Sequence, residues 1–191
     1  GASNVAIGRE ALHTNTTGGE NVAVGKHALR ANTTAGNNVA IGKDALTANT
    51  IGNTNIAIGT DAMTTNVAAD RNVAVGEQAL QNMTAASSTD TYNIGIGYNA
   101  GLSVNSGVNN TLIGGLAGDA ITTGDNNVVL GMSALTTNTT GAQNVSIGSA
   151  SLEVNTTADE NTAVGFKSLN KNTTGASNVA VGSQALADNT T

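Results

Sequence analysis

The sequence has few of the residues that usually stabilise a globular protein. It contains no cysteine and no proline, and its only aromatic residues are Tyr92, Tyr98 and Phe166. The absence of cysteine excludes disulfides, and the scarcity of rings excludes a core built around large aromatic side chains. The absence of proline fits a backbone in which every N–H is needed for a hydrogen-bonded ladder.

Charge and long apolar runs are also scarce. Charged residues make up 10% of the chain, and the net charge of −6 is spread thinly along it. Because no basic cluster occurs, we expect no nucleic-acid partner, and because no apolar run approaches about 20 residues, we expect no membrane insertion of this segment. Yet 39% of the residues are apolar, mostly small aliphatic ones. A composition of this kind argues against disorder.

A repeat of 17 residues fills the chain. Its consensus is N-V-A-[IV]-G-x-x-A-L-x-x-N-T-T-G-x-x, and we number its places as positions 1 to 17. The steps between opening asparagines are 17 residues, with a single step of 21. The opening residues are Asn4, Asn21, Asn38, Asn55, Asn72, Asn93, Asn110, Asn127, Asn144, Asn161 and Asn178. We therefore expect a single repeat array over 1–191, and because its end would continue directly into its start, a slice of a longer fibre.

The first part of each unit is typical of a short strand. Large and small side chains alternate in it, which is the period-two pattern of a strand. In the first unit Val5 and Ile7 are expected to face one side and Ala6 the other. Gly8 ends the strand, because glycine tolerates backbone angles that other residues avoid.

The second part of each unit brings Ala11 and Leu12 back to the core. Its A-L-x-x-N pattern favours a single helical turn, with a second short strand as the alternative. One unit is too small to bury its aliphatic residues alone, so copies must stack. The sequence predicts a mostly β fold: a parallel β-solenoid, a β-roll or β-prism, of eleven 17-residue coils about 50 Å long. A column of asparagines is expected to bond from coil to coil.

The repeat is irregular over residues 85–124. The fifth unit has four extra residues, around 85–92, and Gly101 and Gly118 occupy the leucine place of the next two units. Leu102 and Ile121 are expected to compensate for the missing leucines.

Insertions in repeat arrays map to loops on one face, often the binding face. The irregular zone therefore makes Asp90, Tyr92 and Tyr98 candidate binding residues. The simpler interpretation is a tolerated insertion beside a diverged type of repeat.

Catalytic and metal-binding patterns are missing from the sequence. His13 and His27 occupy different positions of their units, no cysteine accompanies them, and the carboxylates are scattered. A serine triad needs a positioned histidine and carboxylate, and a zinc site needs clustered ligands. We expect no catalytic residue, no metal, no cofactor and no enzymatic activity.

The repeat resembles two families of surface-attachment proteins. The N-V-A-I-G core resembles the head repeats of trimeric autotransporter adhesins, whereas the longer unit, with A-L-x-x-N-T-T-G, looks more like the repeat arrays of phage tail fibres. Residues 110–124 resemble another subtype of such fibres. Adhesin heads use a shorter unit than this one, which leaves their coil geometry open here.

The resemblance implies a parallel homotrimer that is carried on a stalk and binds a glycan or protein receptor on a cell surface. It also implies an extracellular location, on a virion tail fibre or on a bacterial surface. A monomeric solenoid with Val, Ile and Leu all inside one chain is the competing arrangement. The alternative functions are a purely structural filament or matrix scaffold and, more remotely, an ice-binding or polysaccharide-acting solenoid.

Overall fold

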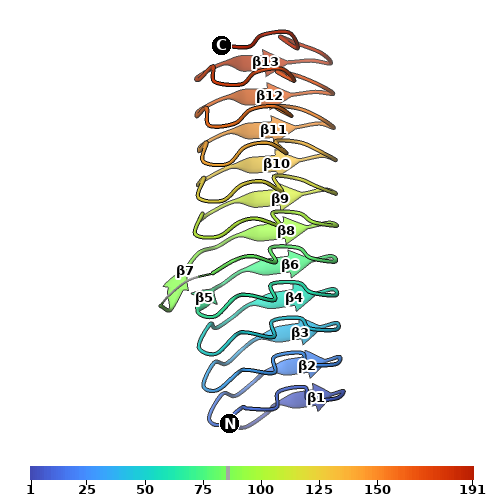
Figure 1. The fold of residues 1–191 in the computed structure, drawn as a ribbon, viewed down its shortest axis with the longest axis vertical. Helices are drawn as coiled ribbons and strands as arrows, with labels where there is room; N and C mark the ends of the chain where they lie inside the picture. The colour runs from blue at the N-terminus through green and yellow to red at the C-terminus, as the bar shows by residue number, and fades with distance from the viewer. Residues whose placement is uncertain (85–86) are drawn as a thin grey trace.

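The N-V-A-I segments form strands, as their alternating pattern predicts. The computed structural model describes residues 1–84 and 87–191 and shows a rod of stacked coils with the termini at opposite ends (Figure 1). Each coil contributes one strand to an 11-stranded parallel sheet, which confirms the β-solenoid. The strands of this sheet are β1 (Val5–Ile7), β2 (Val22–Val24), β3 (Val39–Ile41), β4 (Ile56–Ile58), β6 (Val73–Val75), β8 (Ile94–Ile96), β9 (Thr111–Ile113), β10 (Val128–Leu130), β11 (Val145–Ile147), β12 (Thr162–Val164) and β13 (Val179–Val181).

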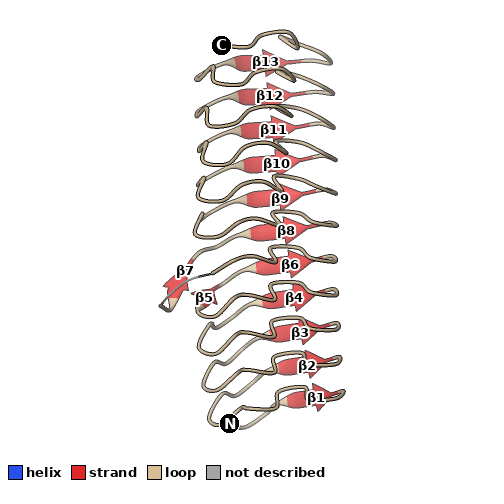
Figure 2. Ribbon diagram, viewed as in Figure 1, coloured by secondary structure: helices blue, strands red, loops and turns tan. Residues whose placement is uncertain are grey.

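The second part of each coil consists of turns. No helix and no second sheet strand forms in the A-L segments of the described chain, so both the favoured helical turn and its alternative are wrong (Figure 2). In the first coil the N–H of Ala11 donates to the Gly8 carbonyl and that of Asn15 to the Leu12 carbonyl, each at 3.3 Å. Glu10 and Leu12 have φ of 55° and 53°. A right-handed helix requires negative φ throughout, so the segment instead makes two consecutive β-turns.

The glycine of position 5 is required both by its conformation and by the space around it. Gly59 has φ of 137°, and a Cβ on it would lie 2.3 Å from the carbonyl oxygen of Gly76 in the next coil. Only glycine adopts such a φ without strain. Successive coils therefore leave no room for a side chain where each strand ends.

The core lies between the sheet and the turns of the same chain. Alanines of position 3, such as Ala40, and leucines of position 9, such as Leu46, are buried. Residues of positions 2 and 4 point away from this core, and Ile41 and Ile58 are exposed. The arrangement with Val, Ile and Leu all inside one chain is therefore wrong. Small alanines let the two layers of a 17-residue coil come close enough to bury one leucine each.

Two columns of buried asparagines link the coils, whereas the sequence predicts one. In the position-1 column, Asn38 Nδ2 donates to the Gly52 carbonyl at 2.9 Å, and Asn38 Oδ1 accepts from the N–H of Asn55 at 2.9 Å. In the position-12 column, Asn49 Nδ2 donates to the same carbonyl at 2.9 Å and to Asn32 Oδ1 at 3.3 Å. Because these buried amides have partners, the thin core tolerates them.

The irregular zone keeps the backbone path of the coil, but the side chains that fill its core come from other positions of the repeat. A Cβ on Gly101 would lie 2.6 Å from Leu112 Cδ1, and one on Gly118 would lie 2.7 Å from Ile121 Cδ1. Leu112 and Ile121 are buried, whereas Leu102 is only half-buried. The predicted compensation is therefore right for Ile121 and wrong for Leu102, whose place Leu112 takes.

Candidate functional site

A lateral arm lies beside the rod at the fifth unit, the unit that has four extra residues (Figure 1). In it β5 (Ala69–Asp70) pairs in parallel with β7 (Thr89–Asp90), beside the main stack (Figure 1). Ala85 and Ala86, which the sequence prediction included in the insertion, lie outside the described residues. The main sheet continues past the arm, because β6 pairs directly with β8 and Val73 lies opposite Ile94. The insertion therefore changes one side of the rod only.

A charged and aromatic cluster lies on this arm. Tyr92 Oη donates to Asp90 Oδ2 at 2.9 Å, and Arg71 forms an ion pair with the same carboxylate. The Arg71 guanidinium also lies over the Tyr92 ring, 5.8 Å from its centroid. The charge of Asp90 raises the pKa of Arg71 further above its ordinary value. Guanidinium, carboxylate and a half-exposed ring together offer hydrogen bonds and a stacking surface to a polar ligand.

The base of the arm is fixed by Asp70. Its side chain accepts hydrogen bonds from the backbone N–H of Asn53 and from the hydroxyl of Ser88, and the residue is buried. Sequence reasoning missed both Asp70 and Arg71, because a 21-residue step hides which residues of neighbouring coils meet. The only signal was their place immediately before an opening asparagine.

The structure brings together two of the three predicted binding residues. Asp90 and Tyr92 share the arm, whereas Tyr98 follows the other end of β8. Six residue steps of nearly extended chain, about 20 Å, separate the two tyrosines. Tyr98 is exposed but is not part of the arm cluster.

One face of the 11-stranded sheet is an extended apolar surface, which we call the outer sheet face. We define it as the residues of positions 2 and 4 in all eleven coils; apart from Thr111 and Thr162, they are Val, Ile or Leu. Even in the middle of the rod, Ile58 and Ile96 are 36% and 37% exposed. Within one chain, no other described residue packs over Ile41, Ile58 or Ile96 closely enough to bury them.

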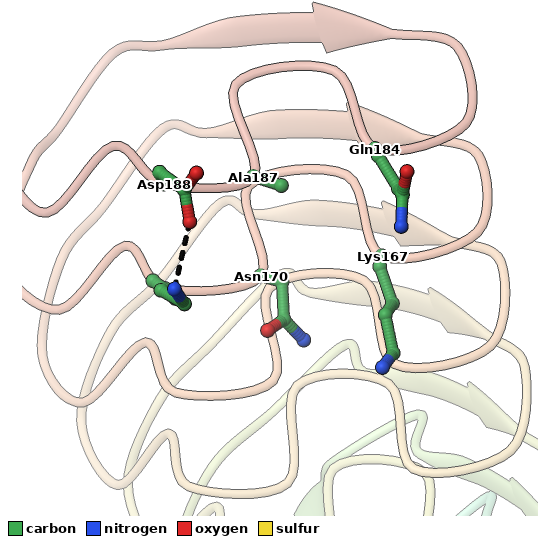
Figure 3. A pocket seen from close by; sticks show the side chains of 6 residues that line it. Lys167, Asn170, Gln184, Ala187 and Asp188 are labelled. Carbon is green, nitrogen blue, oxygen red and sulfur yellow. Dashed lines mark ion pairs between the residues drawn. The ribbon is translucent and has the colours of Figure 1, made fainter.

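A shallow groove of about 400 Å³ crosses the turns of the last two coils (Figure 3). It is lined by Lys167, Asn170, Lys171, Gln184, Ala187 and Asp188. Lys171 Nζ lies 2.7 Å from Asp188 Oδ1. Their hydrogen bond raises the pKa of Lys171 and lowers that of Asp188. No serine, threonine, cysteine or histidine is among these lining residues.

The other notable charged cluster surrounds His27. Its Nδ1 lies 2.8 Å from Asp44 Oδ1, and its Nε2 lies 3.6 Å from Glu10 Oε2. Burial raises the pKa of Asp44, but the hydrogen bonds from His27 and Lys43 and the attraction of their charges together outweigh it and lower the pKa overall. Over residues 1–84 and 87–191, no group of three or more His, Asp or Glu side chains is placed to hold a metal ion.

The threonines of position 13 are used in stacking. Thr33 Oγ1 donates to the Thr50 carbonyl of the next coil at 3.1 Å, and Thr139 Oγ1 donates to the Thr156 carbonyl at 3.2 Å. These hydroxyls therefore bond along the rod, and an ice-binding face gains no support from them.

In the described part of the chain, no helix is both long and apolar enough to cross a membrane. No protein-family model, no curated protein and no solved structure matches this chain.

Proposed function

We propose that this chain is a structural and adhesive segment of a homotrimeric surface-attachment fibre, in which three copies pack their outer sheet faces around a common axis. The observation that carries the proposal is the outer face of the 11-stranded sheet, which is aliphatic along its whole length apart from Thr111 and Thr162. With strands 4.8 Å apart, this face is about 50 Å by 10 Å, or about 500 Å². Patches of that size on soluble proteins commonly mark interaction sites.

A second copy of the chain is the partner that this face fits best. Its side chains recur in register at every coil, so an identical rod presents the same spacing. Burying about 500 Å² of aliphatic surface per chain contributes about 12 kcal/mol before the entropy of association is subtracted. The number of three chains is supported by the resemblance of the repeat to fibre and adhesin repeats, and a closed ring leaves no apolar face exposed.

The arm supplies the adhesive part of the proposal. A trimer would present three copies of the cluster of Arg71, Asp90 and Tyr92 at one level of the rod. Three weak contacts with a glycan or protein receptor add up through effective concentration. Such a role belongs outside the cell, on a virion tail fibre or on a bacterial surface.

The mass of the purified chain in solution tests the trimer. Sedimentation equilibrium at micromolar concentration should give about 56 kDa, three times the 18.8 kDa of one chain. Ile58→Lys, which places a charge in the middle of the outer sheet face, should give a monomer, whereas Asn82→Lys on the exposed turn side should not. A monomeric unsubstituted chain would rule the proposal out.

A purely structural filament or matrix scaffold is the second candidate. It is favoured by the hydrogen bonding of the regular coils, where asparagine and threonine side chains bond chiefly to the next coil. Arm variants separate the two functions. If Tyr92→Ala and Asp90→Ala leave attachment to the host or surface unchanged while the trimer persists, the scaffold is the better description.

A further inference from the structure

The outer sheet face is bounded by two rims. The start rim consists of the position-17 residues, each of which precedes an opening asparagine. The end rim consists of positions 6 and 7, which follow the glycine that ends each strand. Because the strands run across the rod, one rim lies along each long edge of the apolar face.

Every charge on the start rim has an opposite charge on the end rim of the same strand, and the end rims of β1, β3 and β4 have further charges at Arg9, Glu10, Lys43, Asp44 and Asp61. Only three strands have a charged start rim: β2 has Glu20, β6 has Arg71 and β12 has Glu160. The end rim of each of these strands has the opposite charge, and the residues are Lys26, Glu77 and Lys167, respectively. The other start-rim residues are Ser3, Asn37, Thr54, Tyr92, Asn109, Asn126, Gln143 and Ser177.

These opposite charges cannot meet within one chain. A start-rim residue and the end-rim residue of the same strand are six or seven residue steps apart, about 20 Å in nearly extended backbone. All six side chains belong to exposed residues. In the part of the chain that the structure describes, Glu20, Lys26 and Glu77 form no ion pair.

Two of the remaining three charged residues have weak partners only. Glu160 accepts a hydrogen bond from the Ser177 hydroxyl at 3.1 Å, and Lys167 lies over the Phe166 ring, 5.4 Å from its centroid. Arg71 is paired with Asp90, but a guanidinium has five N–H donors and can hold a second carboxylate.

A ring of parallel rods brings the two rims together. In a cyclic assembly each chain uses one surface toward one neighbour and a different surface toward the other. When strands run around the axis, the end rim of one chain faces the start rim of the next. With no axial shift, the facing pairs are then Glu20 with Lys26, Arg71 with Glu77, and Glu160 with Lys167.

If one chain is shifted by one coil along the rod relative to its neighbour, in either direction, part of this charge pairing is lost. In one direction Glu160 would face Ser149 and Ala150, although Glu20 and Arg71 would still find Arg9 and Asp61. In the other direction Arg71 would face Tyr98 and Asn99, and Glu160 would face Ser183 and Gln184. Only the unshifted arrangement pairs all three charged strands, and the repeating aliphatic face by itself would tolerate every shift of one coil.

We propose that the charged rims of β2, β6 and β12 pair between neighbouring chains and hold three copies of this chain in one parallel, unshifted register. This inference rests on the proposed trimer, and it adds an explanation of how neighbouring chains are held in register. The aliphatic face supplies the affinity, and the rim charges reject the shifted alternatives.

Charge reversal and restoration test the pairing at β2. Lys26→Glu and Glu20→Lys should each lower the trimer association constant about tenfold or more in about 0.02 M salt, because the like-charge contact recurs at three interfaces. The double variant Glu20→Lys/Lys26→Glu should restore it. Lys171→Glu, with the same change of charge on the turn side, should leave association unchanged. Sedimentation velocity over a range of concentrations measures all four.

Cross-linking reads the register directly, because the natural chain has no cysteine. A chain with Arg71→Cys and Glu77→Cys should give covalent trimers with a short bismaleimide, whereas Arg71→Cys with Lys43→Cys, two coils away, should not. A trimer whose single charge reversals associate like the unsubstituted chain, or that cross-links equally through both cysteine pairs, overturns the register proposal and leaves the trimer standing. A monomer at every concentration overturns both.

Discussion

The regular coils and the irregular zone share a backbone and differ in their interiors. In the regular coils alanine at position 3 faces leucine at position 9, as in Ala40 and Leu46. In the irregular zone the large side chain comes from the sheet, as Leu112, and glycine occupies the turn. Gly101 has φ of 62°, close to the 53° of Leu12 at the same position. The turn conformation therefore belongs to the coil and not to the residue type, and the large side chain of the interior can come from either layer.

The asparagine column at position 12 also differs between the regular coils and the coils in and next to the irregular zone. In three consecutive coils it is replaced by Met83, Val104 and Ile121, all buried. A buried amide requires partners in the coils on both sides, so the column is interrupted as a block. Replacement of polar by apolar side chains is tolerated when neighbouring coils change together.

The largest expected effect is on the glycine that both regions keep. Gly59→Ala forces a Cβ against the backbone of the next coil at a φ that only glycine accepts, and it should lower the free energy of unfolding by about 3 kcal/mol or more. Gly115→Ala is the matched control, because nothing lies within 4 Å of its added Cβ. It should change stability by less than about 0.5 kcal/mol in urea denaturation. Equal effects of the two substitutions would contradict the close approach of the coils.

The exchange of interiors can be reversed in a double-mutant cycle. Leu112→Ala should cost about 3 kcal/mol through the cavity it leaves. Gly101→Leu should also destabilise, because its Cβ alone would lie 2.6 Å from Leu112 Cδ1. The double variant moves the large side chain from the sheet of one coil to the turn of the preceding coil and should recover at least half of the summed loss in the same urea titration. Strict additivity would show that the two positions do not share one space.

A smaller effect is expected at Asp119 in the irregular zone. Burial raises the pKa of this carboxyl, and its Oδ1 has no hydrogen-bond partner among the described residues. Its ionised form is therefore disfavoured in the folded state, so Asp119→Asn should raise stability at pH 7 by less than about 1 kcal/mol after allowance for solvent screening. The advantage should shrink as the pH falls toward 4, because the native carboxyl then takes up a proton. Thermal melts at pH 7 and pH 4 measure it, and an advantage that grows in acid would contradict this origin.

The smallest effect is expected for the exposed ion pair of Lys171 and Asp188. Both side chains are solvent-exposed, and such pairs contribute little because water and salt screen them. Lys171→Ala should leave the melting temperature of the assembled protein unchanged in low and high salt. A clear loss would mean that the groove beside this pair holds the last coils together.

Much of the fold could be predicted from the sequence, because the 17-residue period fixes which residues stack. The opening asparagines, the glycines of position 5 and the parallel register all follow from it. The turns could not be predicted, because a leucine such as Leu46 ordinarily avoids positive φ, yet here it has φ of 50°. The neighbouring coils impose that conformation, and residue type does not reveal it.

The candidate site was predicted in part for a similar reason. The insertion itself pointed to Asp90 and Tyr92. It could not show that Arg71 of the preceding turn contacts both of them. Spacing along the chain identifies an irregular loop, but only the paired coils determine which side chains meet on it.

The hydrogen bonds between coils run along the length of the rod, since each strand pairs only with the strands above and below it. A pull on the two ends of a single stack therefore loads the outermost coil first, and the coils open one after another from the end. Each coil that opens releases 17 residues, about 55 Å of chain in place of about 5 Å of stack. A fibre built in this way would lengthen in equal steps as single coils open, and it would absorb a sudden load before the whole stack came apart.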